Sequence, residues 1–520
     1  MPDTPPARPA PAEPTPAPQF ERSMGLVATF SLGFTYLSPL GAVCALLPLG
    51  LTNAGPPSIW WIVIVGLGQL LVALVFGEIV SQYPITGGIY PWSRRLWGRR
   101  YAWLAAWVYL CALVVSITSI TEYAVPFVAS LFGFTTSNTA KLLVAVGILL
   151  LALLVNTAGT RWLARVARAG FFAEIIGVVA LGLYLLIFER HNSFAVFFDA
   201  MNSTKDGSYL SGFLSAALVG LFMFYGFEAC GDVAEEVHDA GRQIPKAMIL
   251  TIVFGGISAL AAFVGYILSA PDLQAIVDGD IADPVTAIVQ ASLGQTGSKV
   301  FLVVALTAFL SCVLSLQAAL SRLIFSFARD GMLPASKPLS TLTSTTRIPR
   351  NAMLVACLLP MAVCLWVYAY PGSLPRVTAF AVIGIYLCFQ MVVLAALRQR
   401  IKGWKPAGNW SLGRAGLPIN IAALLYGIAA MAVLALPAND TTGLSFADKW
   451  IVLVGLATIL ATGLLYMLIA RPYNRSNTPE NDALAIAHQR QESPPPTDSA
   501  LPEEDPAYPE RSTRPQATKQ

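Results

Sequence analysis

The chain has 520 residues, of which 56% are hydrophobic and only 12% are charged, and its mean hydropathy is +0.63. Soluble domains carry about 25% charged residues, so this composition excludes an ordinary water-soluble protein. We interpret the net charge of +4 as a consequence of membrane topology, and we expect no nucleic-acid partner.

Both ends of the chain are polar and rich in proline. Residues 1–20 contain no apolar segment of the kind found in a cleavable signal peptide, so we predict a disordered N-terminal tail over residues 1–22. Residues 472–520 hold too few apolar groups to offset chain entropy, and we predict a disordered C-terminal tail there. We predict that residues 23–471 form one domain in the lipid bilayer.

Apolar runs long enough to cross a bilayer recur between the two tails. A bilayer core of about 30 Å requires about 20 helical residues. The predicted spans are 24–49, 58–83, 102–130, 142–157, 169–188, 211–231, 244–269, 300–327, 351–370, 377–397, 416–436 and 450–470. We therefore predict an all-α integral membrane protein with twelve transmembrane helices. The seven cysteines lie inside apolar runs and the three histidines are scattered, so we expect no disulfide framework, no metal site and no cofactor.

The basic residues predict the orientation of the chain. If the N-terminus is cytoplasmic, 27 of the 33 Lys and Arg residues lie on the inner side. Inner loops carry an excess of Lys and Arg in membrane proteins. We expect both termini to be cytoplasmic and the protein to reside in the plasma membrane.

Two of the spans contain residues that interrupt a helix. The first contains TYLSPLGAV at 35–43, with Pro39 and Gly41, and the sixth contains FMFYGFEACG at 222–231, with Gly226. Proline removes a helical donor, and glycine tolerates unwound backbone. Interrupted helices at matching places in two halves of a chain indicate the midplane site of a transporter. We therefore predict a five-plus-five inverted repeat with broken helices one and six, followed by two extra helices.

The candidate substrate-binding residues share a position at or beside these two interruptions. They are Tyr36, Ser38, Pro39, Leu40, Gly41, Phe224, Tyr225, Gly226, Phe227 and Glu228.

Acidic side chains within the spans are the candidate coupling groups, because an ionisable residue at membrane depth is costly. Glu228 follows the second interruption, where it could bind a substrate ammonium or the coupling proton; the alternative is a vestibule acid paired with a loop arginine. Glu174 could carry a proton or pair with an arginine near the interface. We expect Glu235, Glu236 and Asp239 to lie in a solvated helix end or loop.

Three motifs carry a family resemblance. They are GEIVSQYPITGGIYPW at 77–92, FYGFEACGDVAEEVHDAGRQIPKAM at 224–248 and FARDGMLP at 327–334. In this order they resemble the amino acid–polyamine–organocation superfamily of permeases, and the stretch at 153–177 leans toward its amino acid/choline branch. Members of that branch carry amino acids, GABA, choline or polyamines. The chain departs from the superfamily at the first break, where Ser-Pro-Leu-Gly at 38–41 replaces the common Gly-Ser-Gly.

The resemblance implies a secondary active transporter that moves an amino acid or a related organic amine by alternating access. We expect coupling to protons; coupling to sodium is the alternative, because unwound carbonyls of helix one could coordinate it. A choline, ethanolamine or polyamine carrier or exchanger would share these motifs, as would a nutrient sensor built on a transporter scaffold. We expect no enzymatic activity, since neither H-E-x-x-H nor Gly-x-Ser-x-Gly occurs.

Overall fold

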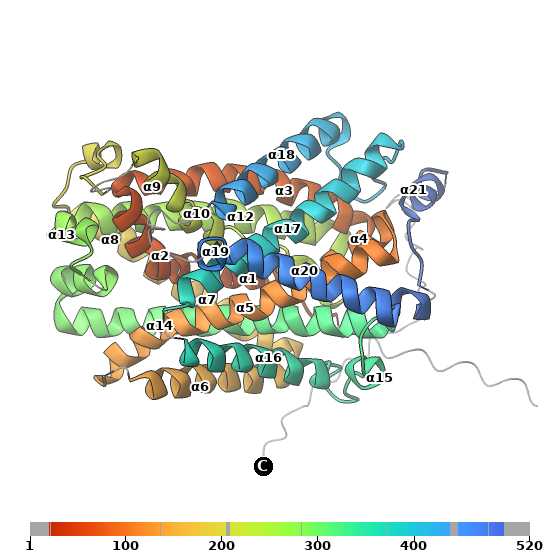
Figure 1. Ribbon diagram of the computed structural model, residues 1–520, viewed down its shortest axis with the longest axis horizontal. Coiled ribbons are helices and arrows are strands. Elements are labelled where there is room, and N and C mark those ends of the chain that lie inside the picture. The colour runs from red at the N-terminus through yellow and green to blue at the C-terminus, as the bar shows by residue number, and fades with distance from the viewer. Residues whose placement is uncertain are drawn as a thin grey trace, which may run out of the picture.

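The molecule is a bundle of long helices that run side by side along its longest axis (Figure 1). The computed structural model describes residues 20, 22–135, 137–203, 208–281, 283–370, 372–436, 446–476 and 478–492. Over these residues the only β contact is an isolated parallel bridge between Met24 and Val237. The protein therefore has the all-α architecture that the apolar runs predict.

Short 3-10 helices and one π-helical segment are written as η. The helices of the first part of the chain are α1 (Leu26–Leu37), α2 (Pro39–Ala54), η1 (Pro56–Ile59), α3 (Trp60–Gln82), α4 (Ile89–Leu96), α5 (Arg99–Phe132), α6 (Asn138–Thr157), α7 (Thr160–Glu174), the π-helical η2 (Ile175–Ala180), α8 (Leu181–Phe188) and η3 (Phe194–Phe198). Those of the middle are α9 (Tyr209–Ser215), α10 (Leu218–Met223), α11 (Ala229–Asp232), η4 (Ala234–Glu236), α12 (Ala240–Ser269), α13 (Leu273–Asp278), α14 (Pro284–Arg329) and α15 (Ser336–Leu339). The last are α16 (Arg350–Ala369), α17 (Leu374–Ile401), η5 (Gly413–Ala415), α18 (Gly416–Ala435), α19 (Phe446–Lys449), α20 (Ile451–Ala470), η6 (Pro472–Arg475) and α21 (Ala483–Glu492).

Each of the twelve predicted spans overlaps a helix or a short series of helices, which confirms the predicted membrane fold. Eleven helical segments of the described chain are long and apolar enough to cross a bilayer. The remaining span is the sixth, in which α9, α10 and α11 are each too short because the chain is interrupted between them. Apolar side chains on α6, α18 and α20 are largely exposed, as lipid-facing helices require, whereas α5 is mostly enclosed.

The packing joins equivalent segments of the two halves. The second segment, α3, packs along the seventh, α12, and the third segment, α5, packs along the eighth, α14. Between these pairs, the broken first segment contacts the broken sixth through α1 and α11. This arrangement places both interruptions inside the protein, where irregular backbone is tolerated within a membrane.

The two ends of the bundle differ in chemistry. One end, here called the basic end, carries α4, the turn between α4 and α5, α15 and α21, at the right of Figure 1. The opposite end carries α9, η3 and α13. Arginines 94, 95, 99 and 100 all lie at the basic end, in or beside the α4–α5 turn.

Part of each expected tail is packed against the bundle. Phe20 is buried and its ring contacts that of Phe325, with 5.2 Å between centroids. Residues 472–476 and 478–492, for which we expect disorder, contain η6 and α21, and Ala483 and Ala487 are buried. That expectation is therefore wrong for this segment, because a few apolar residues suffice once neighbouring acids are held by arginines of the α4–α5 turn. Residues 1–19, 21, 477 and 493–520 of the predicted tails lie outside the described residues.

Candidate functional site

The first transmembrane segment is broken at Ser38. Its backbone has φ 46° and ψ 74°, a left-handed conformation that ends α1, and its N–H donates to the Phe34 carbonyl at 2.8 Å. Pro39 then starts α2 and has no N–H to contribute. Gly41 follows in a confined position: a Cβ there would lie 2.8 Å from the Ser38 hydroxyl and 3.4 Å from the ring of Phe309. The interruption predicted from Pro39 and Gly41 is thus confirmed.

The sixth segment is broken at Gly226, directly against the first break. Residues 224–228 separate α10 from α11, and Gly226 has φ 125°, which side chains other than glycine rarely adopt. A Cβ at Gly226 would lie 2.8 Å from the backbone nitrogen of Leu37 and would also meet the ring of Tyr36. The two interrupted helices therefore touch through backbone at this point.

Glu228 lies beside this contact and is fully buried. One carboxylate oxygen accepts the backbone N–H of Gly226 at 2.7 Å, and the other accepts the hydroxyl of Tyr109, on α5, at 3.2 Å. None of the ion pairs among the described residues includes Glu228. The alternative of a vestibule acid paired with a loop arginine is therefore not what the structure shows.

Asp232 is a second buried acid at this site, and it is absent from the site residues predicted from the sequence. It follows Glu228 by four residues, the spacing that places two side chains on one helical face. The Tyr109 hydroxyl lies 3.4 Å from one Asp232 oxygen, and the other oxygen is buried with no hydrogen-bond partner. The four-residue spacing is the available signal, but the predicted span ends at residue 231, one residue before Asp232.

Glu174 lies against the first break, at Ser38 and Leu40. It is the last residue of α7, immediately before the π-helical turn η2, and it is fully buried. Its carboxylate lies beside the Ser38 side chain and the Leu40 backbone, although neither oxygen makes a hydrogen bond of ordinary geometry. No arginine pairs with it among the described residues, and single π-turns of this kind are frequent at functional sites.

The aromatic candidates divide into two groups. Tyr225 meets Tyr36 edge to face, with 6.4 Å between ring centroids, so both rings lie at the junction of the breaks. The Phe224 ring instead occupies the space beside two glycines, Gly66 of α3 and Gly256 of α12.

Phe227 also belongs to the packing around the site. Its ring contacts Phe76 of α3 and Phe389 of α17, with centroids 5.7 and 5.3 Å away. The Leu40 side chain likewise packs against Gly177 of η2. These side chains fix the positions of the broken segments, while Tyr36 and Tyr225 border the acids.

A buried ion pair lies between the site and the basic end. Arg322 of α14 donates to both oxygens of Glu236, at 2.9 and 3.2 Å, and the Thr160 hydroxyl donates to the same carboxylate at 2.6 Å. Both charged side chains are at most 1% exposed. The expectation that Glu236 is solvated is therefore wrong, because α14 supplies a partner that no local pattern reveals. Asp239 is exposed, as expected.

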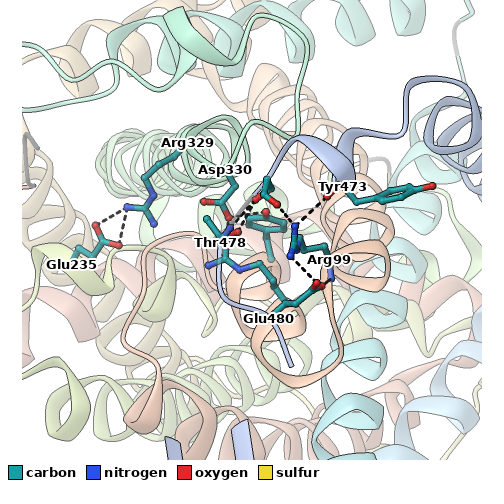
Figure 2. A network of polar contacts seen from close by, with 10 residues as sticks. Arg99, Glu235, Arg329, Asp330, Tyr473, Thr478 and Glu480 are labelled. Carbon is teal, nitrogen blue, oxygen red and sulfur yellow. Dashed lines mark hydrogen bonds and ion pairs between the residues drawn. The ribbon is translucent and has the colours of Figure 1, made fainter. Parts of the chain in front are cut away.

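A polar network lies at the surface of the basic end (Figure 2). Arg329 pairs with Glu235 at 3.1 Å, and the next residue, Asp330, accepts the Tyr90 hydroxyl at 2.7 Å and pairs with Arg94. Burial raises the pKa of Tyr90, so its phenol stays a neutral donor to Asp330. Burial also lowers the pKa of Arg94.

The C-terminal segment completes the network. Glu480 pairs with Arg99 at 2.9 Å, Thr478 accepts a hydrogen bond from Arg94 at 2.9 Å, and Asp482 pairs with Arg95. Figure 2 shows Thr478 and Glu480 beside Asp330 and Arg99. Two loops of the membrane domain and the C-terminal segment are thus joined at one place.

The described residues contain no group of three or more His, Cys, Asp or Glu side chains that could hold a metal ion. What the geometry does define is a membrane protein with two interrupted helices in contact, buried acids at the contact and ion pairs that close one end. That combination is the architecture of a membrane transporter.

The comparisons with known proteins agree. The sequence pattern of the amino acid permease family matches residues 24–464, so the chain belongs to that family, within the amino acid–polyamine–organocation superfamily. It is 27% identical to an uncharacterized amino-acid permease of Schizosaccharomyces pombe, over 79% of this chain and 78% of the relative. It is 25% identical to the amino-acid permease BAT1 of Arabidopsis thaliana, over 81% of this chain and 86% of the relative. It is also 25% identical to the thiamine transporter thi9 of Schizosaccharomyces pombe, over 85% and 82%.

Proposed function

We propose that the protein is a secondary active transporter that moves an amino acid or a related organic amine by alternating access, with the substrate bound where the two breaks meet. The observation that carries this proposal is the contact of Gly226 with Tyr36 and Leu37, next to a buried Glu228 that has no basic partner. Irregular backbone and an uncompensated acid are both costly within a membrane. A substrate that binds there would compensate both.

Several polar groups at this place lack partners in the described structure. The buried hydroxyls of Tyr36 and Ser38, both oxygens of Glu174 and one oxygen of Asp232 make no hydrogen bond. Buried polar groups are almost always satisfied in proteins, so a cluster of exceptions requires an explanation. A polar substrate together with a coupling ion supplies one.

Alternating access requires that one end of the bundle open while the other is closed. The Arg322–Glu236 pair and the network around Asp330 close the basic end in this structure. In the proposed cycle these contacts break when α14 and η4 separate. We further propose that the basic end faces the cytoplasm and that the protein acts in the plasma membrane, since arginine and lysine concentrate in inner loops.

Protons are the coupling ion that the acids favour. A buried carboxylate without a basic partner is stabilised when a proton or a cation neutralises it. Glu228 and Glu174 both fit this description, and both lie beside the first break. Sodium is the second candidate, supported by the unwound backbone around Ser38.

The test is accumulation of labelled substrate in proteoliposomes under an imposed pH gradient, comparing the wild type with Glu228→Gln. This variant keeps the shape of the side chain but cannot titrate. We expect it to lose accumulation, or the dependence of accumulation on the pH gradient, while retaining its thermal stability. Glu122→Gln, on the same helix as Tyr109 but about 20 Å further along at 1.5 Å per residue, is the control and should accumulate substrate normally. Normal accumulation by Glu228→Gln with an unchanged pH profile would remove Glu228 from the mechanism.

A further inference from the structure

We propose that Glu228 and Asp232, bridged by Tyr109, form a binding site for the ammonium or guanidinium group of an organic cation, and that the transported substrate carries net positive charge. The inference rests on the proposed transport function and names the class of substrate. It follows from a pair of carboxylates whose negative charge no residue of the described chain neutralises.

The two acids converge on one hydroxyl from the same short segment. Glu228 precedes α11 and Asp232 ends it, and Tyr109 lies 3.2 Å from the first carboxylate and 3.4 Å from the second. A single phenol can donate only one hydrogen bond at a time. One carboxylate is therefore always short of a donor, and an oxygen of Asp232 has none at all.

The nearby cation is already committed. Arg322 is close enough to Asp232 to interact with it electrostatically. The guanidinium of Arg322, however, donates to both oxygens of Glu236, at 2.9 and 3.2 Å. No ion pair among the described residues includes Glu228 or Asp232. Glu228 accepts the Gly226 N–H as well as the Tyr109 hydroxyl, whereas Asp232 has Tyr109 alone as a side-chain donor. A cation with several N–H groups would supply the donors and the charge that this pair of buried carboxylates lacks.

The remaining surroundings also favour a cation. The rings of Tyr36 and Tyr225, set edge to face at 6.4 Å, border the acids and can contact an ammonium through their faces. The hydroxyl of Tyr36 is buried beside Glu228 and Tyr109 and makes no hydrogen bond of ordinary geometry. It can accept a hydrogen bond from an N–H donor.

The place that would attract an anion is occupied by the protein itself. The N-terminus of α2, whose free backbone amides favour negative charge, has the Glu174 carboxylate beside Leu40 and Ser38. A substrate carboxylate would have to approach amides that already face an acid. The site therefore attracts positive charge at α11. At α2 the backbone amides already face the Glu174 carboxylate, so they do not attract a second negative charge.

The experiment uses the full chain, purified and placed in lipid nanodiscs for binding and in proteoliposomes for uptake. The probes are putrescine, choline and arginine as cations, alanine as a zwitterion and glutamate as an anion. We expect at least one cation to raise the melting temperature and to be taken up, because a ligand that binds only the native state stabilises it. We expect alanine and glutamate to do neither.

Asp232→Asn keeps the size of the side chain and removes one charge. We expect this variant to need a cation concentration about tenfold higher, or more, for half-maximal thermal stabilisation. A hydrogen bond to a charged group contributes at least that factor in affinity. Asp232→Glu should recover much of the affinity, and Glu122→Gln should behave as the wild type. If Asp232→Asn fails to fold, Tyr109→Phe tests the same site by removing the shared donor, and should alter cation affinity severalfold.

The outcomes separate the two proposals. Uptake of alanine or glutamate without stabilisation by any of the three cations would overturn the assignment of charge and leave the transporter proposal standing. Unchanged cation affinity in both Asp232→Asn and Tyr109→Phe would remove the dicarboxylate from the site. Accumulation of none of the five probes would count against both.

Discussion

Gly226 is the residue whose conformation most tightly limits the site. Its φ of 125° disfavours every other residue, and its α-carbon lies against the backbone of Leu37. We expect Gly226→Ala to abolish transport and to destabilise the fold by about 2–4 kcal/mol, because the added methyl group meets backbone that cannot move aside. Thermal unfolding and uptake measure the two effects. Gly147→Ala on α6, where the methyl group meets nothing within 4 Å, should change neither.

At the scale of single residues, the sequence reveals some of the buried acids of the site and not others. Glu228 could be identified because a glycine interruption and an acid stand two residues apart in an apolar run, a local pattern. Asp232 and Glu236 lie in the same stretch, yet their burial depends on Tyr109 of α5 and Arg322 of α14, more than 80 residues away in each case. The sequence pattern assigns Glu236 to a solvated helix end or loop and assigns no role to Asp232, and only the tertiary partners show that both acids are buried.

At the scale of elements, the breaks themselves were predictable. Pro39 and the glycines disrupt helical hydrogen bonding wherever they occur, so the ends of α1 and α10 follow from residue chemistry. Their matching positions in the two halves predict a midplane site. The direction of the Phe224 and Phe227 rings could not be predicted, because it depends on small residues of α3 and α12 and on aromatic rings of α3 and α17.

The C-terminal segment 472–492 gives a prediction at this scale. Its ion pairs with the α4–α5 turn, Glu480 with Arg99 and Asp482 with Arg95, are partly exposed, so each contributes about 0.5 kcal/mol. We expect Glu480→Gln combined with Asp482→Asn to speed amide hydrogen exchange of this segment severalfold, while α5 and α14 stay protected. Removing residues 493–520 should leave exchange in the segment unchanged. Equal protection in the double variant would show that apolar packing of Ala483 and Ala487 is sufficient.

At the scale of the whole molecule, the fold follows from composition with little ambiguity. A backbone in lipid must satisfy its own hydrogen bonds, so a chain with twelve apolar runs has few alternatives to a helical bundle. The order of the motifs then indicates the family, and the two halves pair α3 with α12 and α5 with α14. Composition does not show how an end of the bundle closes. The closure depends on pairs such as Arg94 with Asp330, whose members lie on different segments and have no common local pattern.

Orientation in the membrane is the last property to test, and cysteine labelling in intact cells measures it. The native cysteines are largely protected, since six are buried and only Cys111 is partly exposed. We expect cysteines introduced at positions 10 and 500 to resist an impermeant thiol reagent, because α21 lies at the basic end and positive residues are retained in the cytoplasm. Asn202→Cys lies on an exposed turn between η3 and α9, two elements of the opposite end, and should react. Labelling at either tail without permeabilisation, with Asn202→Cys unreactive, would reverse the orientation and assign the Arg322–Glu236 closure to the outer side.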